Sequence, residues 1–85
     1  MATQISIDLG SYKTVISEGA RIVLEQPSIV TVDVESFNPV YFGEKAKASL
    51  GRTPETLTCV RPIERGVIAD YDLALAMLSE YMKKS

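Results

Sequence analysis

Apolar and polar residues alternate near the start of the chain, and this pattern predicts β-strands, because successive strand side chains point to opposite faces. Within residues 4–9 every second residue is isoleucine or leucine, so one face of this segment is apolar. Two further β-rich runs, 14–17 and 21–25, follow after short polar turns. Three strands with such short connections predict an antiparallel meander.

The middle of the chain predicts three more strands and a helix. The β-rich runs are 28–33, 40–42 and 57–60, and Pro, Asn and Gly lie between them. Residues 44–50 contain good helix formers, and Gly51 follows as the C′ residue that ends many helices. We therefore expect a short helix between the fifth and sixth strands.

The last element is an amphipathic helix, which the sequence predicts over residues 71–83. Asp70 is a suitable N-cap, because its carboxylate can accept a backbone N–H of the first turn. Apolar residues at helical spacing predict the buried face: Ala74, Met77, Leu78, Tyr81 and Met82. The preceding segment 62–69 is interpreted as a connector in which Pro62 and Gly66 bracket a turn.

The composition is that of a small folded domain, and it excludes several kinds of site. The chain has 85 residues, nine basic and eleven acidic, for a net charge of −2, and 46% of its residues are apolar. This charge argues against a nucleic-acid surface. There is no histidine and Cys59 is the single cysteine, so imidazole sites, Ser-His triads, intrachain disulfides and CxxC zinc sites are excluded.

The sequence predicts neither a signal peptide nor a membrane span. The first residues lack a basic region, and Asp8 interrupts the apolar stretch that follows. No window approaches the roughly 20 apolar residues of a membrane span. Together with the lone thiol, these features predict a cytosolic protein.

The clearest candidate chemistry lies in Asp8–Thr14, where a predicted strand ends and a glycine-led turn follows. Successive backbone N–H groups of such a turn can bind phosphate oxygens, and a Cβ at Gly10 would keep a phosphate away. Asp8 could hold Mg²⁺ through water, and Lys13 could neutralise phosphate charge. The alternative is an ordinary hairpin turn, because turns of this composition are common.

A resemblance to a known family runs through nearly the whole chain. It begins in Asp8–Thr14 and continues through Gln26–Val30, Phe42–Lys47, Leu50–Pro54 and Arg61–Tyr71. The first of these segments is similar to the first phosphate loop of the superfamily that contains actin, sugar kinases and heat-shock chaperones. The later segments, in their order and spacing, are similar to the bacterial actin homologue MreB and its paralogue Mbl.

The resemblance implies an α+β fold. This would be an incomplete actin-like (ribonuclease H-like) ATPase domain with an antiparallel three-strand meander, a small α/β insertion and a C-terminal helix. Residues 1–27 would form the first three strands of subdomain IA, and 28–61 the insertion called subdomain IB. Residues 62–85 would be the connector and the helix that return to subdomain IA.

The resemblance also implies a function. Members of the family are cytoplasmic, membrane-associated ATPases that form filaments and direct cell-wall synthesis. Carried over to this chain, the first phosphate loop falls on Gly10, Ser11, Tyr12 and Lys13, with Asp8 near a Mg²⁺ held through water. The implied cofactors are ATP and Mg²⁺. The implied partners are other copies of the chain, the cell-wall synthesis machinery and the inner membrane surface, without nucleic acid.

Several departures from the family pattern limit what the chain is expected to do alone. Ser11 replaces the usual Thr, and Lys13 stands where MreB proteins often have Asn. We expect no amphipathic anchor helix before Ile5. Family members are several times longer, so the second phosphate loop, the adenosine pocket and the acid that positions the attacking water are expected beyond Ser85. We therefore expect no catalytic residue in this chain, no tight ATP binding and no hydrolysis.

A second hypothesis is a truncated interaction or oligomerisation module that binds no nucleotide. If the chain folds alone, Ile5, Ile7 and Leu9 would lie on an exposed strand edge, which is a template for pairing with another chain. The C-terminal helix would also lose part of its cover. We expect a homodimer or a higher oligomer, formed by edge pairing or by exchange of that helix.

Overall fold

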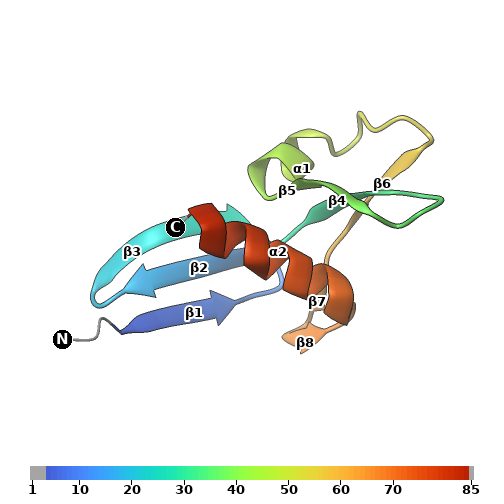
Figure 1. Cartoon of the computed structure of the whole chain (residues 1–85). Coiled ribbons are helices and arrows are strands. Elements are labelled where there is room, and N and C mark those ends of the chain that lie inside the picture. Colours follow the sequence, from blue (N-terminus) through green and yellow to red (C-terminus); the bar gives the residue numbers. More distant parts are fainter. Residues whose placement is uncertain (1–3, 85) are drawn as a thin grey trace.

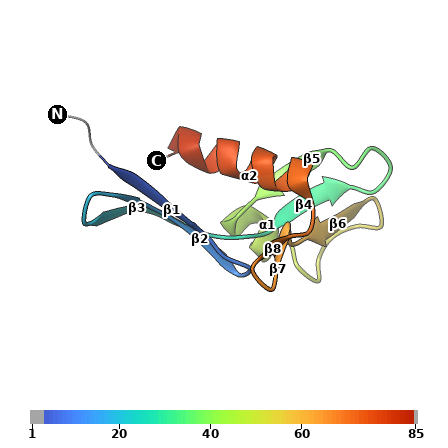
Figure 2. The ribbon, with the colours of Figure 1, turned by 90° about the horizontal axis from the view of Figure 1, so that it is seen from below.

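Eight strands and two helices make up residues 4–84, the part of the chain that the computed structural model describes. In chain order they are β1 (Ile5–Leu9), β2 (Lys13–Glu18), β3 (Arg21–Pro27), β4 (Val30–Asp33), β5 (Pro39–Phe42), α1 (Glu44–Ala48), β6 (Leu57–Val60), β7 (Ile63–Glu64), β8 (Val67–Ile68) and α2 (Tyr71–Lys84). The molecule is elongated, with principal extents of 49, 22 and 20 Å. Helix α2 lies along one side of the two larger sheets (Figure 1, Figure 2).

The predicted meander is confirmed as an antiparallel sheet with the strand order β1-β2-β3. Its register places Ile7 opposite Ile16 and Ile16 opposite Leu24. Ile16 and Leu24 are buried in the core that α2 covers. Strand β3 runs on to Pro27, further than the predicted end at residue 25.

A second sheet has the order β5-β4-β6, and its central strand is buried on both faces. Val30 and Val32 belong to the core cluster with residues of α2. On the opposite face, the buried hydroxyl of Thr31 lies 3.1 Å from the hydroxyl of Ser49, which follows α1. All three strands expected in the middle of the chain are therefore confirmed, although β4 begins two residues later than predicted.

Helix α1 is shorter than predicted. It ends at Ala48 with Ser49 as its C-cap, so Gly51 is not the C′ residue, although it has a left-handed φ of 77° in the turn beyond the helix. No side chain of the helix's own segment caps its start. The N–H of Glu44 donates instead to Oε1 of Gln26 in β3, over 2.9 Å. A contact between distant segments therefore caps α1.

The connector between β6 and α2 contains a hairpin that the sequence does not predict. Strands β7 and β8 pair antiparallel, and Arg65 and Gly66 form their turn with φ values of 53° and 76°. Positive φ at both central residues suits the twist of a tight hairpin. Two-residue strands are too short to show a period, so the interpretation of this segment as a simple connector is corrected.

Helix α2 begins after Asp70, as predicted, because Oδ1 of Asp70 accepts the N–H of Leu73 over 3.0 Å. Its buried residues are Leu73, Ala74, Met77 and Tyr81. The predicted apolar face is therefore partly wrong: Leu73 belongs to it, Leu78 is half-buried, and Met82 is 43% exposed. The reason is that α2 crosses two sheets. Its buried residues are those that face the core shared with these sheets, and they are not the same as the widest apolar stripe of the helix.

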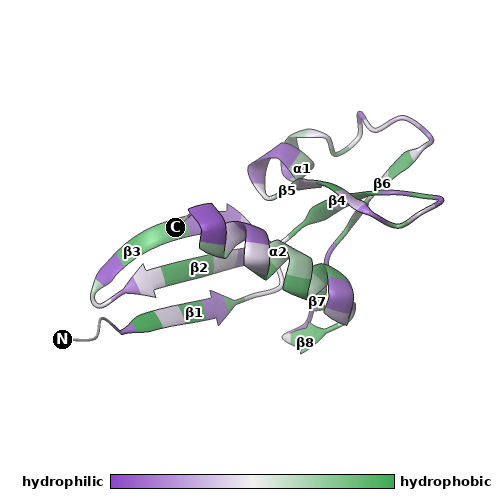
Figure 3. Cartoon of the chain, in the orientation of Figure 1, coloured by the Kyte–Doolittle hydropathy of each residue, from purple (hydrophilic) through white to green (hydrophobic). Residues whose placement is uncertain are grey.

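The hydropathy of the residues in α2 agrees with the way the helix packs on the sheets. The middle of α2 is largely apolar where it lies over the sheets, and its C-terminal end is polar (Figure 3). Within residues 4–84, no helix combines the length and the apolar character that a membrane crossing requires.

Candidate functional site

The turn between β1 and β2 has two backbone donors without an acceptor among the described residues. The N–H of Gly10 donates to the carbonyl oxygen of Lys13 over 3.0 Å and closes the turn. Between them, the amides of Ser11 and Tyr12 donate to no backbone or side-chain acceptor within residues 4–84. Adjacent unpaired N–H groups in a turn are suited to binding an anion.

Glycine is required at position 10 for a structural reason as well. A Cβ added there would lie 2.9 Å from the carbonyl oxygen of Lys13, which is a backbone atom of the same turn. Real Cβ atoms do not approach backbone oxygens so closely, so the turn would have to shift. Gly10 therefore allows the shape of the turn.

Two buried hydroxyl groups support the turn from beneath. The N–H of Ser28 donates to the carbonyl oxygen of Tyr12 over 2.9 Å, and the hydroxyl of Ser28 shares a 2.8 Å hydrogen bond with that of Thr14. Both Ser28 and Thr14 are fully buried. The peptide after Tyr12 is trans, so its N–H, which belongs to Lys13, points to the side opposite Ser28.

The β7–β8 hairpin contacts the same turn from another side. The Ser11 hydroxyl accepts the N–H of Gly66 over 3.0 Å, although the two residues are 55 positions apart. The missed hairpin is therefore a support of the candidate site.

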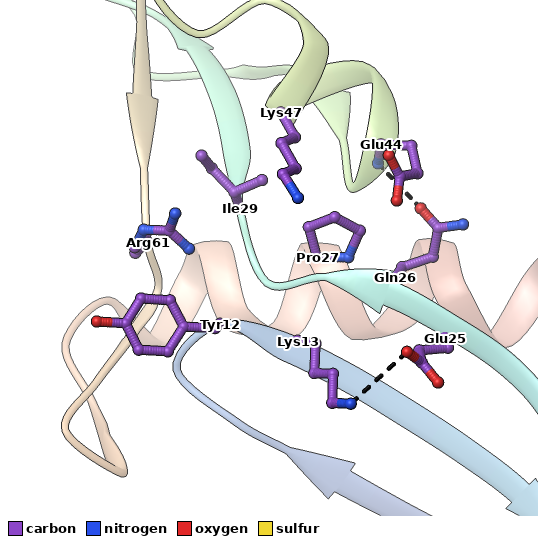
Figure 4. A pocket seen from close by; sticks show the side chains of 9 residues that line it. All are labelled: Tyr12, Lys13, Glu25, Gln26, Pro27, Ile29, Glu44, Lys47 and Arg61. Carbon is purple, nitrogen blue, oxygen red and sulfur yellow. Dashed lines mark hydrogen bonds and ion pairs between the residues drawn. The ribbon is translucent and has the colours of Figure 1, made fainter.

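Lys13 and Asp8 lie on the two strands beside the turn. Nζ of Lys13 is 3.6 Å from Oε2 of Glu25 in β3 (Figure 4). The two side chains are 63% and 52% exposed, so this ion pair is weak and leaves Lys13 able to move.

Asp8 is exposed on β1, opposite Val15. Within residues 4–84, no three carboxylate, Cys or His side chains are grouped as metal ligands. Asp8 is thus a single exposed carboxylate, which could hold Mg²⁺ only together with water and phosphate oxygens, because Mg²⁺ commonly takes one or two protein carboxylates. It does not fit a metal enclosed by protein ligands.

Two hollows flank the turn, and Tyr12 and Arg61 line both. The first, of about 300 Å³, extends toward α1 and includes Lys13 and Lys47 (Figure 4). The second, of about 360 Å³, lies against the β7–β8 hairpin and includes Ser11. Cζ of Arg61 lies 5.1 Å from the centre of the Tyr12 ring, which is cation–π distance. The turn is thus bordered by open space and by cationic side chains, with the carboxylates of Glu25 and Glu44 also lining the first hollow.

Comparison with known proteins decides the family. A family model described as "MreB/Mbl protein" matches residues 2–85. The chain belongs to the MreB/Mbl family. Among its MreB/Mbl relatives, the cell shape-determining protein Mbl of Bacillus subtilis (strain 168) is 40% identical over 84 residues, and the cell shape-determining protein MreB of Pasteurella multocida is 38% identical over 88. Each alignment covers 98% of this chain and 25% of the relative, so the chain spans a quarter of their length.

Solved MreB structures share the fold. The crystal structure of MreB 5 of Spiroplasma citri bound to AMPPNP aligns with a TM-score of 0.86 and 27% identity, over 94% of this chain and 24% of that one. The structure of the same protein bound to ADP aligns with a TM-score of 0.84 and 28% identity, over 93% and 24%. The chain therefore has the actin-like MreB fold, with antiparallel sheets and helices.

The sequence places four of the five candidate residues of this MreB/Mbl chain in one turn, because they are contiguous. It does not indicate the residues that surround that turn: Glu25, Ser28, Arg61 and Gly66. The only available signal was that three of them, Ser28, Arg61 and Gly66, lie in segments similar to MreB and Mbl. That similarity does not indicate which other residues they contact.

Proposed function

We propose that the turn at residues 10–13 binds phosphate groups of ATP in an actin-like, filament-forming cell-shape protein. The observation that carries this proposal is the pair of unpaired amides at Ser11 and Tyr12, at the end of β1. Phosphate oxygens would accept these hydrogens, and Asp8 would hold Mg²⁺ through water. The similarity to structures bound to AMPPNP and ADP supports the choice of ligand.

The proposal extends to organisation and location. Residues 1–27 and 62–85 would belong to subdomain IA and residues 28–61 to subdomain IB, and the separate sheets β1-β2-β3 and β5-β4-β6 support such a division. The protein would act in the cytoplasm at the inner membrane surface, with other copies of itself and the cell-wall synthesis machinery as partners. The described residues supply one phosphate-binding turn, so we expect neither tight ATP binding nor hydrolysis by this chain alone.

The test is an NMR titration of the 85-residue chain with Mg·ADP and with pyrophosphate. We expect weak binding, with the largest shifts at the amides of Ser11 and Tyr12. Gly10→Ala should abolish these shifts, while Gly19→Ala, in a turn with open space around the added Cβ, should preserve them. Shifts confined to other parts of the chain would rule out the proposed site. A submicromolar dissociation constant for Mg·ATP would contradict the expected weakness.

A second candidate function is self-association through β1, without nucleotide. Strand β1 is at the edge of its sheet among the described strands, and Ile5 and Ile7 are 55% and 41% exposed. An apolar strand with unpaired backbone groups on its outer side favours pairing with another chain. Sedimentation at several concentrations tests it, because a monomer that persists at high concentration excludes this function.

A further inference from the structure

The structure assigns Arg61 as a second source of phosphate contacts beside the turn at residues 10–13, an inference that rests on the proposed function. We propose that its guanidinium binds a pyrophosphate-containing anion whose other oxygens contact the amides of Ser11 and Tyr12. Arg61 lines both hollows that flank the turn, and Ser11 shares the second of them.

The pattern of ion pairs distinguishes Arg61 from Lys13. Lys13 has a carboxylate partner in Glu25, although this exposed ion pair is weak. Within the part of the chain that the structure describes, Arg61 and Arg65 form no ion pair. The second hollow contains both arginines and a single acid, Glu64, so its lining is net positive. A partly buried guanidinium without a carboxylate partner is available to an external anion.

Packing holds Arg61 in place. The next two residues, Pro62 and Ile63, are buried, so the backbone that follows Arg61 is anchored. The guanidinium lies over the ring of Tyr12, which limits its rotation (Figure 4). Stacking uses the face of the guanidinium and leaves the N–H groups at its edge able to donate. The contact with Tyr12 thus places the guanidinium beside the turn and leaves its edge available to a ligand.

The ligand chemistry follows from the two kinds of donor that border the same hollows. Ser11 and Tyr12 present adjacent amides at the tip of the turn, and Arg61 presents a planar fork beside the same tip. A chain of linked phosphates can contact amides with one group and a guanidinium with the next, whereas a single phosphate cannot use both as fully. We therefore expect pyrophosphate to bind more tightly than inorganic phosphate.

The experiment is a titration of the 85-residue chain with pyrophosphate, followed by the NMR shifts of the Ser11 and Tyr12 amides at low and high salt. Arg61→Gln should weaken binding about tenfold and reduce its salt dependence. Arg61→Lys keeps the charge but loses the planar fork, so it should weaken binding about threefold. Arg21→Gln removes a charge at the opposite end of the meander and should leave binding unchanged.

The outcomes separate the two proposals. If the wild-type chain binds pyrophosphate at Ser11 and Tyr12 and Arg61→Gln binds equally well, the role of Arg61 is overturned and the proposed function stands. If pyrophosphate shifts neither amide in the wild-type chain, both are overturned. An equal loss in Arg21→Gln would indicate general charge attraction and overturn the role of Arg61. Should Arg61→Gln not fold, Arg61→Lys decides, because wild-type affinity in that variant overturns the inference.

Discussion

The hydroxyl of Tyr81 donates a 2.5 Å hydrogen bond to the carbonyl oxygen of Pro27, which joins the C-terminal half of α2 to the end of β3. Tyr81 is 1% exposed. Burial raises the pKa of the Tyr81 hydroxyl above its usual range, and the nearby Glu44 carboxylate adds to this shift. The raised pKa keeps the hydroxyl protonated, and so able to donate, to a higher pH than an exposed tyrosine hydroxyl.

Replacing Tyr81 by Phe tests how much this hydrogen bond contributes to the free energy of unfolding. The variant keeps the ring but leaves the carbonyl of Pro27 without its partner, so the free energy of unfolding should fall by about 1–2 kcal/mol. Tyr71→Phe is a matched control, because Tyr71 lies on the same helix and is 65% exposed. Chemical denaturation measures both. Equal stability of the two variants would show that the Tyr81 hydroxyl contributes nothing.

Gly43→Ala should destabilise the junction between β3 and α1. Gly43 has φ of 64° and ψ of −127°, and an added Cβ would overlap Oε1 of Gln26 and lie 2.9 Å from the Tyr81 hydroxyl oxygen. Strain and the disturbed cap of α1 should together lower the free energy of unfolding by about 2 kcal/mol or more. Gly51→Ala, at φ of 77° in open space, should cost about 1 kcal/mol. Thermal melting that ranks them in the opposite order would refute this assignment.

The stability of the β4–β5 loop should depend on pH through Asp33. The backbone N–H groups of Ser36 and Glu35 donate to this carboxylate and hold its pKa below the ordinary value of 3.8. A lowered pKa means that the unfolded chain binds more protons, so the stabilisation is present above pH 3.8 and is lost as pH falls through the folded-state pKa.

Asp33→Asn isolates this effect, because the amide oxygen can still accept hydrogen bonds but does not titrate. Its free energy of unfolding should fall less steeply than that of the wild type between neutral pH and acid below 3.8. An NMR titration of the Asp33 carboxyl group in the folded chain provides an independent measurement. A midpoint at or above the ordinary value would contradict the prediction.

Concentration-dependent association should disappear when β1 carries an added charge. Ile5 is 55% exposed and lies opposite Glu18, so Ile5→Lys introduces a charge on the edge without burying it. A lysine on an edge strand opposes pairing with another chain. Sedimentation velocity should show association of the wild type and a monomeric Ile5→Lys chain. Leu50→Lys, 46% exposed in the turn after α1, should associate like the wild type.

The regular elements could be predicted because their signals are local. Alternation in residues 4–9 and the turns that follow are enough for the meander, and Asp70 followed by apolar residues at helical spacing is enough for α2. The β7–β8 hairpin could not be predicted, since its strands are two residues long. Of the buried face of α2, the sequence predicts Ala74, Met77 and Tyr81 but misses Leu73, since the full face depends on which sheets the helix crosses.

The candidate site also has one part that the sequence predicts and another that it does not. By itself, the sequence determined that Gly10, Ser11 and Tyr12 form one glycine-led turn after a strand, because neighbours in sequence are neighbours in such a turn. Only the tertiary structure decided that Gly66 and Arg61 border that turn and that Lys13 pairs with Glu25. These contacts arise when sheets and helix pack around a common core, and packing depends on volumes and angles that no local pattern of residues encodes.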